Sequence, residues 1–162
     1  MSRYNVGKTI TIHHDHLVVE LGKGKVAIVD LDDLQTVLLC NWSLGKNGYV
    51  MGKLNGEKVY LHHLLYPNEE AVLFMNHDHL DLRRSNLRPC THSQRHAHQR
   101  PVGNRKYKGC YLQGDRWIAL IKDKGKTRYL GRYDSEVEAA RAYDEAAKEQ
   151  YGELAYLNMR EE

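Results

Sequence analysis

Hydrophobic and polar positions alternate in short stretches along the first half of the chain, which is typical of β-strands. Three such stretches lie within residues 8–29. Leu34 and Val37 then follow helical spacing, and glycine-containing turns at residues 45–48 and 55–56 indicate two hairpins. The pattern therefore predicts a β-rich N-terminal unit with one short helix.

The last third of the chain follows a different pattern. Three strands are predicted, at residues 107–112, 116–122 and 127–133. Ser135 and Glu138 then form a capping box that opens a helix with alanines at helical spacing, and the helix is expected to end before Gly152. This pattern predicts a three-stranded antiparallel sheet packed on one helix, over residues 107–162.

Residues 72–98 lie between these regions and combine several local patterns. The apolar run 72–75 predicts a buried strand that ends in a polar cluster. An arginine-rich loop carrying Asn86 follows, and a helix is expected to start near Thr91. We therefore predict an α+β fold with one unit over residues 1–98. Residues 99–106 lack apolar periodicity and are interpreted as a short basic linker.

Composition and charge narrow the classes of function. The 162 residues include no apolar run near the roughly 20 residues that span a bilayer, and the N-terminus lacks an apolar signal core. We therefore expect no membrane partner and a cytoplasmic location, in a bacterial host if a phage encodes the protein. Residues 83–132 hold fourteen Lys and Arg but only two acids, Asp115 and Asp123. That imbalance indicates a surface that binds a polyanion such as nucleic acid.

The polar cluster in residues 72–98 suits metal-assisted phosphodiester hydrolysis. A divalent ion stabilises charge on the phosphate while a neutral imidazole takes a proton from water. His77 is the candidate general base, since imidazole titrates near neutral pH. Asn86 is the candidate partner that fixes its tautomer through a side-chain carbonyl.

The same residues resemble a known nuclease motif. Asn76-His77, Asn86-Leu87-Arg88 and Thr91-His92-Ser93-Gln94 are similar to the HNH motif of phage and intron-encoded homing endonucleases, and residues 61–65 are similar to the segment that precedes it. The resemblance implies a ββα-metal finger, with His77 as general base, Asn86 as its orienting residue and Mg²⁺ or Mn²⁺ as cofactor.

Two positions depart from that family pattern. Asn76 stands where the family usually has Asp, and Arg95 stands where it usually has Asn on the helix; both are metal ligands in the family. Asn76 can still coordinate through its carbonyl oxygen, whereas a guanidinium has no lone pair to offer. Substitute ligands are Asp78, His92 and His96.

The C-terminal region resembles the Apetala/ethylene-response-factor type of DNA-binding domain. The matching residues are Tyr107-Lys-Gly, Arg116-Trp117, Tyr129-Leu-Gly131, the run 138–144 and Leu157-Asn158. The resemblance implies that the sheet lies in the DNA major groove. It assigns DNA contacts to Lys108, Tyr111, Lys122, Thr127 and Tyr129, and we expect Arg83, Arg84, Arg88 and Arg95 to contact phosphates.

The sequence thus predicts a homing-type DNA endonuclease with double-stranded DNA as partner. A single HNH site in a monomer cuts one strand, so nicking by a monomer, or by a weak homodimer, is expected. One alternative is a catalytically degenerate HNH protein that acts as a DNA-binding protein or regulator, which Arg95 favours. Another is a structural zinc protein built on Cys90 and the histidines.

Overall fold

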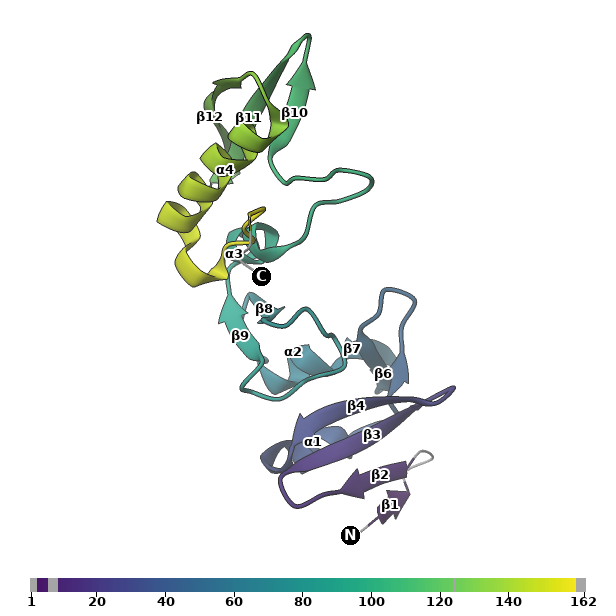
Figure 1. Cartoon of the computed structure of the whole chain (residues 1–162). Coiled ribbons are helices and arrows are strands. Elements are labelled where there is room, and N and C mark those ends of the chain that lie inside the picture. The colour runs from purple at the N-terminus through teal and green to yellow at the C-terminus, as the bar shows by residue number, and fades with distance from the viewer. Residues whose placement is uncertain (1–2, 6–8, 124, 160–162) are drawn as a thin grey trace. The chain divides into compact units, whose positions relative to one another are not determined.

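The computed structural model describes residues 3–5, 9–123 and 125–159. The chain divides into two compact units, Met1–Cys90 and Thr91–Glu162. Figure 1 shows the ribbon of both.

The first unit begins with a four-stranded antiparallel sheet in the order β1-β2-β3-β4. Its strands are β1 (Arg3–Asn5), β2 (Thr9–Ile12), β3 (His16–Gly22) and β4 (Lys25–Asp30). Alternate residues of β3, Leu17, Val19 and Leu21, are buried, and so are Ala27 and Val29 of β4. Because side chains in a strand alternate between faces, one face of this sheet forms part of the core.

A second antiparallel sheet follows η1 (Leu31–Asp33) and α1 (Leu34–Val37). Its strands are β5 (Ser43–Leu44), β6 (Val50–Leu54) and β7 (Glu57–Tyr60), in that order. Asn55 and Gly56, between β6 and β7, have φ values of 52° and 87°. Two left-handed residues are what a two-residue type I′ hairpin requires, and Asn-Gly adopts this conformation readily. The hairpin predicted at residues 55–56 is confirmed.

The last elements of the first unit are α2 (Leu61–Leu65) and the antiparallel pair β8 (Ala71–Phe74) and β9 (Leu87–Cys90). All four residues of β8 are buried, as the apolar run predicted. The loop between β8 and β9 is tied to β4, because Ile28 N–H donates to Leu80 O (2.8 Å) and Leu82 N–H donates to Ile28 O (2.8 Å). A segment far along the chain is therefore fixed on the N-terminal sheet.

The second unit contains α3 and a three-stranded antiparallel sheet that packs against α4. Its elements are α3 (His92–His98), β10 (Cys110–Gln113), β11 (Arg116–Asp123), β12 (Lys126–Tyr133), α4 (Glu136–Tyr151) and η2 (Gly152–Leu154). Ser135 and Glu138 form the predicted capping box at the start of α4. Ala139 and Ala140 of this helix pack with Ala119 of β11. Small side chains on both elements let helix and sheet approach closely.

Gly109 allows an especially close contact in this unit. Its φ is +75°, and a Cβ placed there would lie 2.0 Å from Tyr143 Cδ2 and 2.7 Å from Leu120 O. The buried Tyr143 ring therefore packs directly against the backbone of residue 109, and only glycine leaves room for it there.

The structure confirms the α+β class and the predicted sheet with its helix. The strands β8 and β9 belong to the first compact unit, whereas α3 belongs to the second. The predicted ββα-metal finger and the predicted domain functions stay predictions. Among the described residues, no helix is long and apolar enough to cross a membrane.

Candidate active site and nucleic-acid interface

His77 lies in the loop between β8 and β9, directly after the buried strand. Its φ is +61°, a left-handed value that is uncommon for a residue other than glycine. Two backbone bonds hold the ends of the loop: His77 N–H donates to Phe74 O (3.0 Å), and Met75 N–H donates to Asn86 O (3.0 Å). The unusual backbone conformation is thus supported on both sides, and the His77 side chain is partly buried.

Asn86 fixes the backbone next to His77. Its buried side chain accepts a hydrogen bond through Oδ1 from Asn76 N–H (2.9 Å) and donates through Nδ2 to Asp81 O (2.7 Å). One amide therefore ties both sides of the loop together. This geometry lets Asn86 position His77 through the backbone; its predicted effect on the imidazole tautomer stays a prediction.

Asn76 and Asp78, two predicted metal ligands, form consecutive turns around His77. Asn76 Oδ1 accepts from Asp78 N–H (2.8 Å), and Asp78 Oδ1 accepts from Leu80 N–H (2.9 Å). Side-chain oxygens that bind a backbone N–H two residues on are typical of Asx-turns. Both residues are exposed, so this turn presents an amide and a carboxylate at the surface beside His77.

Asp81 is a buried anion in this loop that the sequence analysis did not single out. It accepts hydrogen bonds from Arg83 Nε (2.8 Å) and Nη2 (2.8 Å), and from Asn76 Nδ2 (3.2 Å). The Arg83 hydrogen bonds lower the pKa of the Asp81 carboxyl, which keeps it charged. Two charge-assisted bonds in one plane are strong and directional. Arg83 therefore stabilises the loop by pairing with Asp81 of the same loop.

His79 is a second residue that the sequence analysis passed over. Its ring stacks on Tyr49 with 4.0 Å between centroids and 16° between planes, and it meets Phe74 edge-on at 5.0 Å. Burial lowers the pKa of His79, while the charge of Asp78 acts in the opposite direction. The neutral ring anchors the loop on the turn before β6.

Three of the four arginines predicted to contact phosphates, Arg83, Arg84 and Arg88, have partners within the protein. Arg84 donates to Asp33 Oδ1 (2.6 Å) and, through its backbone N–H, to Asp30 Oδ2 (2.7 Å). Arg88 Nη1 donates to the carbonyl oxygens of Arg84 and Leu87. The Arg84 contacts hold the loop on β4 and η1. Phosphate contacts by these arginines stay predictions.

The remaining predicted metal ligands, His92 and His96, are exposed on α3 in the second unit, where Arg95 is partly buried. Within residues 3–5, 9–123 and 125–159, no group of three or more His, Cys, Asp or Glu side chains is gathered to hold a metal ion.

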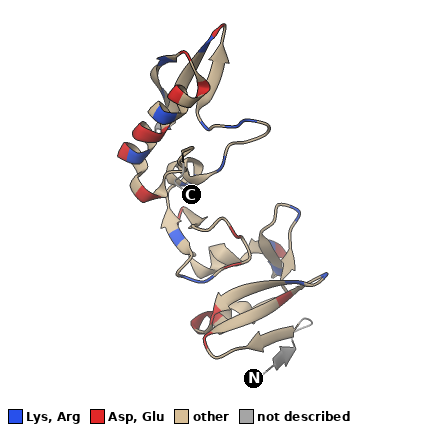
Figure 2. Cartoon of the chain, viewed as in Figure 1, with Lys and Arg blue, Asp and Glu red and all other residues tan. Residues whose placement is uncertain are grey.

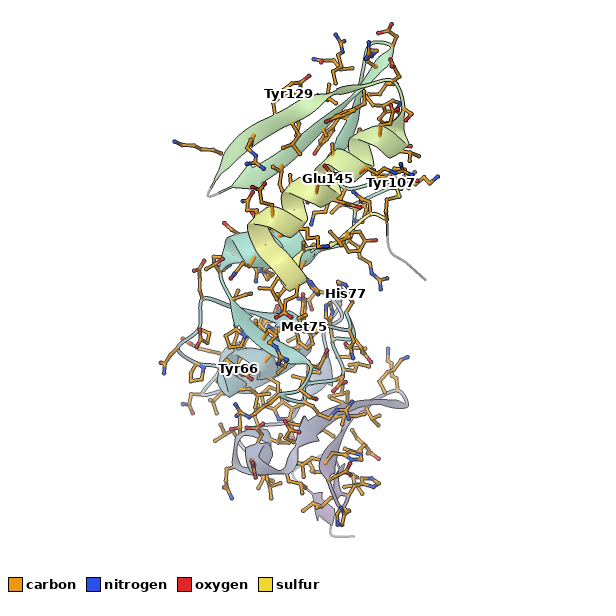
Figure 3. All side chains as sticks on the ribbon, turned by 60° about the vertical axis from the view of Figure 1, so that its left-hand side comes forward. Tyr66, Met75, His77, Tyr107, Tyr129 and Glu145 are labelled. Atoms are coloured by element: carbon orange, nitrogen blue, oxygen red, sulfur yellow. The ribbon has the colours of Figure 1, made fainter. Side chains whose placement is uncertain are left out.

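Four of the five residues predicted to contact DNA from the C-terminal sheet share its uncovered face. They are Tyr111, Lys122, Thr127 and Tyr129. Strand pairing joins Lys122 to Thr127 and Leu120 to Tyr129, whereas the neighbouring Ala119 and Ile121 face α4 and are buried. In Figure 3, Tyr129 is labelled on the sheet and Glu145 on α4. Tyr129 is 58% exposed, so this face is available to a ligand.

Lys108, the fifth of these residues, stabilises α3. Its ammonium donates to the carbonyl oxygens of His96, Ala97 (2.7 Å) and Gln99 (2.7 Å) at the helix C-terminus. Burial lowers the pKa of Lys108 to about 8. An ammonium has three donors, and all three are used here, so a DNA contact by Lys108 would compete with the end of α3.

A general-base candidate on a braced loop, together with a sheet whose exposed face carries tyrosine, threonine and lysine side chains, is what a nuclease with a nucleic-acid-binding module would need. Comparison with known proteins places the chain within that class. It is 30% identical over 145 residues to an uncharacterised HNH endonuclease of Acanthamoeba polyphaga mimivirus, a match that covers 85% of this chain and 76% of the relative. The chain belongs to the HNH endonuclease family.

A second group of relatives matches a shorter part of the chain. Dehydration-responsive element-binding protein 2C of Arabidopsis thaliana is 50% identical over 48 residues, or 28% of this chain and 14% of that protein. An AP2-like ethylene-responsive transcription factor of the same plant is 38% identical over 79 residues, or 46% of this chain and 18% of its own length. The chain thus spans less than a fifth of these two plant relatives. No family model and no solved structure matches.

Proposed function

We propose that this protein is a DNA endonuclease of the homing type that hydrolyses a phosphodiester bond near a recognised site. The observation that carries the proposal is His77 on a loop braced by Asn86 and Asp81. Membership of the HNH endonuclease family supports the same chemistry. The plant relatives named as element-binding proteins and transcription factors support double-stranded DNA as the partner.

In the proposed reaction, His77 removes a proton from the attacking water. A neutral imidazole suits this role near pH 7. Asn86 and the Asn76–Asp78 turn keep the backbone of His77 in its left-handed conformation, so the backbone that carries the ring does not have to be ordered during the reaction. The chain thus supplies a preorganised base.

Asn76 and Asp78 fit a divalent ion such as Mg²⁺ or Mn²⁺. Both carry the oxygen donors that these ions prefer, and both are exposed beside His77. Asn76 Oδ1 accepts one hydrogen bond, which leaves its second lone pair for coordination. A bound ion would stabilise negative charge on the phosphate and the leaving oxygen. Mg²⁺ commonly binds few protein ligands and keeps several waters, so a sparse set is sufficient.

The C-terminal sheet positions the DNA. Its uncovered face presents Tyr111, Lys122, Thr127 and Tyr129 for contacts with groove and backbone. With one His77 per chain, a bound monomer nicks one strand, and a double-strand break needs a second copy.

Plasmid cleavage tests the proposal. Supercoiled plasmid carrying candidate target DNA is incubated with Mg²⁺ or Mn²⁺, with and without chelator. We expect metal-dependent nicking by the wild type and loss of nicking in His77→Ala, with nearly unchanged DNA affinity in a gel shift. Equal loss of cleavage and affinity in His77→Ala would show that His77 is structural.

A second candidate function is a DNA-binding protein or regulator without nuclease activity. Arg95 favours it, because a guanidinium replaces a metal ligand of the family at this position. This function predicts salt-sensitive DNA binding by the wild type with no nicking under any metal condition, on DNA shown by gel shift to contain the bound site.

A further inference from the structure

Two neighbouring pockets in the second unit form one groove beside the DNA-binding face. Their volumes are about 470 Å³ and 290 Å³, and their linings share His96, Lys108, Gly109, Tyr111 and Lys122. One wall is α3 with the segment that follows it, and the other is the sheet with α4. Tyr111 and Lys122 also belong to the uncovered face of the sheet, so the groove opens onto that face.

Cationic side chains line this groove without acidic ones among its described lining residues. These cations are Arg100, Arg105 and Lys122, and the imidazole rings of His92 and His96 lie beside them. Figure 2 shows Lys and Arg positions on the loop that connects α3 to β10. The positive electrostatic potential of such a groove attracts a polyanion. The low dielectric constant of the groove walls strengthens that potential.

Aromatic rings are the second feature of the groove lining. Tyr107, Tyr111, Tyr143 and Tyr151 contribute to the two pockets. Tyr111 is 36% exposed, and the guanidinium of Arg105 lies 4.8 Å from its ring centroid. Because the Arg105 guanidinium lies over one face of the Tyr111 ring, the pair together offers a stacking surface for a nucleobase, and the arginine can also meet the adjacent phosphate.

The walls of the groove are held in place by specific contacts. Lys108 fastens the end of α3 through its three carbonyl bonds, and Tyr156 N–H donates to Ala97 O (3.0 Å). On the opposite side, Tyr151 Oη donates to Lys122 O (2.6 Å). The cations and rings therefore face a recess that exists before any ligand binds, which lowers the entropic cost of binding.

We propose that this groove binds a segment of single-stranded DNA, with unpaired bases against the tyrosines and phosphates on Arg100, Arg105 and Lys122. A paired base in a duplex keeps its faces stacked inside the helix and cannot enter a tyrosine-walled recess. A cationic groove with aromatic platforms is the general design of proteins that bind single strands. The site is additional to the duplex-binding face and does not depend on cleavage.

Fluorescence anisotropy of the full-length chain with chelator present tests this site apart from catalysis. The probes are a fluorescein-labelled oligothymidylate of about 12 nucleotides, within the usual site sizes, and a labelled duplex bearing a site that the protein binds. The variant Arg100→Ala/Arg105→Ala should bind the single strand about ten-fold more weakly, since it removes two phosphate contacts and one stacked cation.

Matched variants separate this site from the duplex-binding face. Arg141→Ala removes an exposed cation of α4 outside the groove and should change single-strand affinity less than about two-fold. Tyr129→Ala should weaken duplex binding and leave single-strand binding unchanged, because Tyr129 does not line the groove. Equal losses for both probes in the Arg100/Arg105 variant, or no measurable single-strand binding by the wild type, would overturn the proposal.

Discussion

The two units hold their candidate functional residues by different means. In the first unit, buried polar side chains stabilise the His77 loop. The Asn86 amide accepts from Asn76 N–H and donates to Asp81 O, and the Asp81 carboxylate accepts from Arg83. In the second, the apolar contact between α4 and the sheet leaves the opposite face of the sheet uncovered. A candidate general base needs a fixed position, whereas side chains that contact DNA need access to solvent.

The difference also changes how basic residues are interpreted. Arg83 and Arg84 in the first unit pair with Asp81 and Asp33, which are only 9% and 6% exposed. Lys122 of the second unit is exposed on the groove. Arg83 and Arg84 therefore contribute mainly to folding, whereas Lys122 is available for binding.

The largest expected effect on stability is in the second unit, from Gly109→Ala. The new methyl group would clash with Tyr143 and Leu120 O, and alanine disfavours a φ of +75°. Overpacking and backbone strain together should cost about 4 kcal/mol. Chemical denaturation should show this loss, with a far smaller one for Gly114→Ala, where φ is +66° and no atom lies within 4 Å of the added Cβ. Equal losses in the two variants would exclude the Tyr143 contact as the cause.

Asn86→Ala tests the polar bracing of the first unit. It removes two hydrogen bonds and leaves Asn76 N–H and Asp81 O without this partner, at a cost of about 3 kcal/mol. Cleavage should fall further than stability alone explains, because the loop no longer fixes His77. Denaturation and plasmid nicking below the melting temperature measure the two effects. Ser85→Ala, at the exposed neighbouring position, is the control and should change neither.

Lys108→Met tests whether Lys108 is primarily structural. Losing the three charge-assisted bonds to the end of α3 should cost about 2 kcal/mol and increase hydrogen exchange in α3. Lys126→Met, at an exposed position of β12, removes the same charge without this effect. Unchanged exchange in α3 combined with weaker duplex binding would instead assign Lys108 to DNA recognition.

The smallest expected effect concerns pH and His79. Its pKa is lowered in the folded protein, so the neutral ring is favoured there. The unfolded chain then binds more protons than the folded one just below its own pKa of about 6.5. The contribution of neutral His79 to the free energy of unfolding should therefore be fully present above that pH and be lost as pH falls through the pKa of the folded state. His79→Phe keeps an aromatic ring on Tyr49 and should reduce the difference in melting temperature between pH 7 and pH 5. An unaltered difference would assign the pH dependence to other groups.

Local patterns predicted much of the fold. Alternation in β3 and β4, the Asn-Gly hairpin and the Ser135 capping box each depend on residues a few positions apart. The uncovered sheet face was predictable too, because side-chain direction follows from position within a strand. Asn76, His77 and Asn86 could be singled out because their order and spacing resemble the HNH motif.

Other features depend on contacts between residues that are distant in sequence, and local sequence patterns do not predict such contacts. Arg84 reaches Asp33 across 51 positions, and His79 stacks on Tyr49 in the turn before β6. No local signal distinguishes a paired arginine from one available to phosphate, or a stacked histidine from an exposed one.

By itself, the sequence determined the elements, the HNH resemblance and the side of the sheet that faces outward. The tertiary structure alone decided which charges are paired, that α3 belongs with the C-terminal unit, and that its basic flank forms a groove with the sheet. The physical reason is the separation along the chain over which each kind of interaction acts. Hydrogen bonding and periodicity act between neighbours along the chain, whereas burial, ion pairing and grooves arise only when folding brings distant segments together.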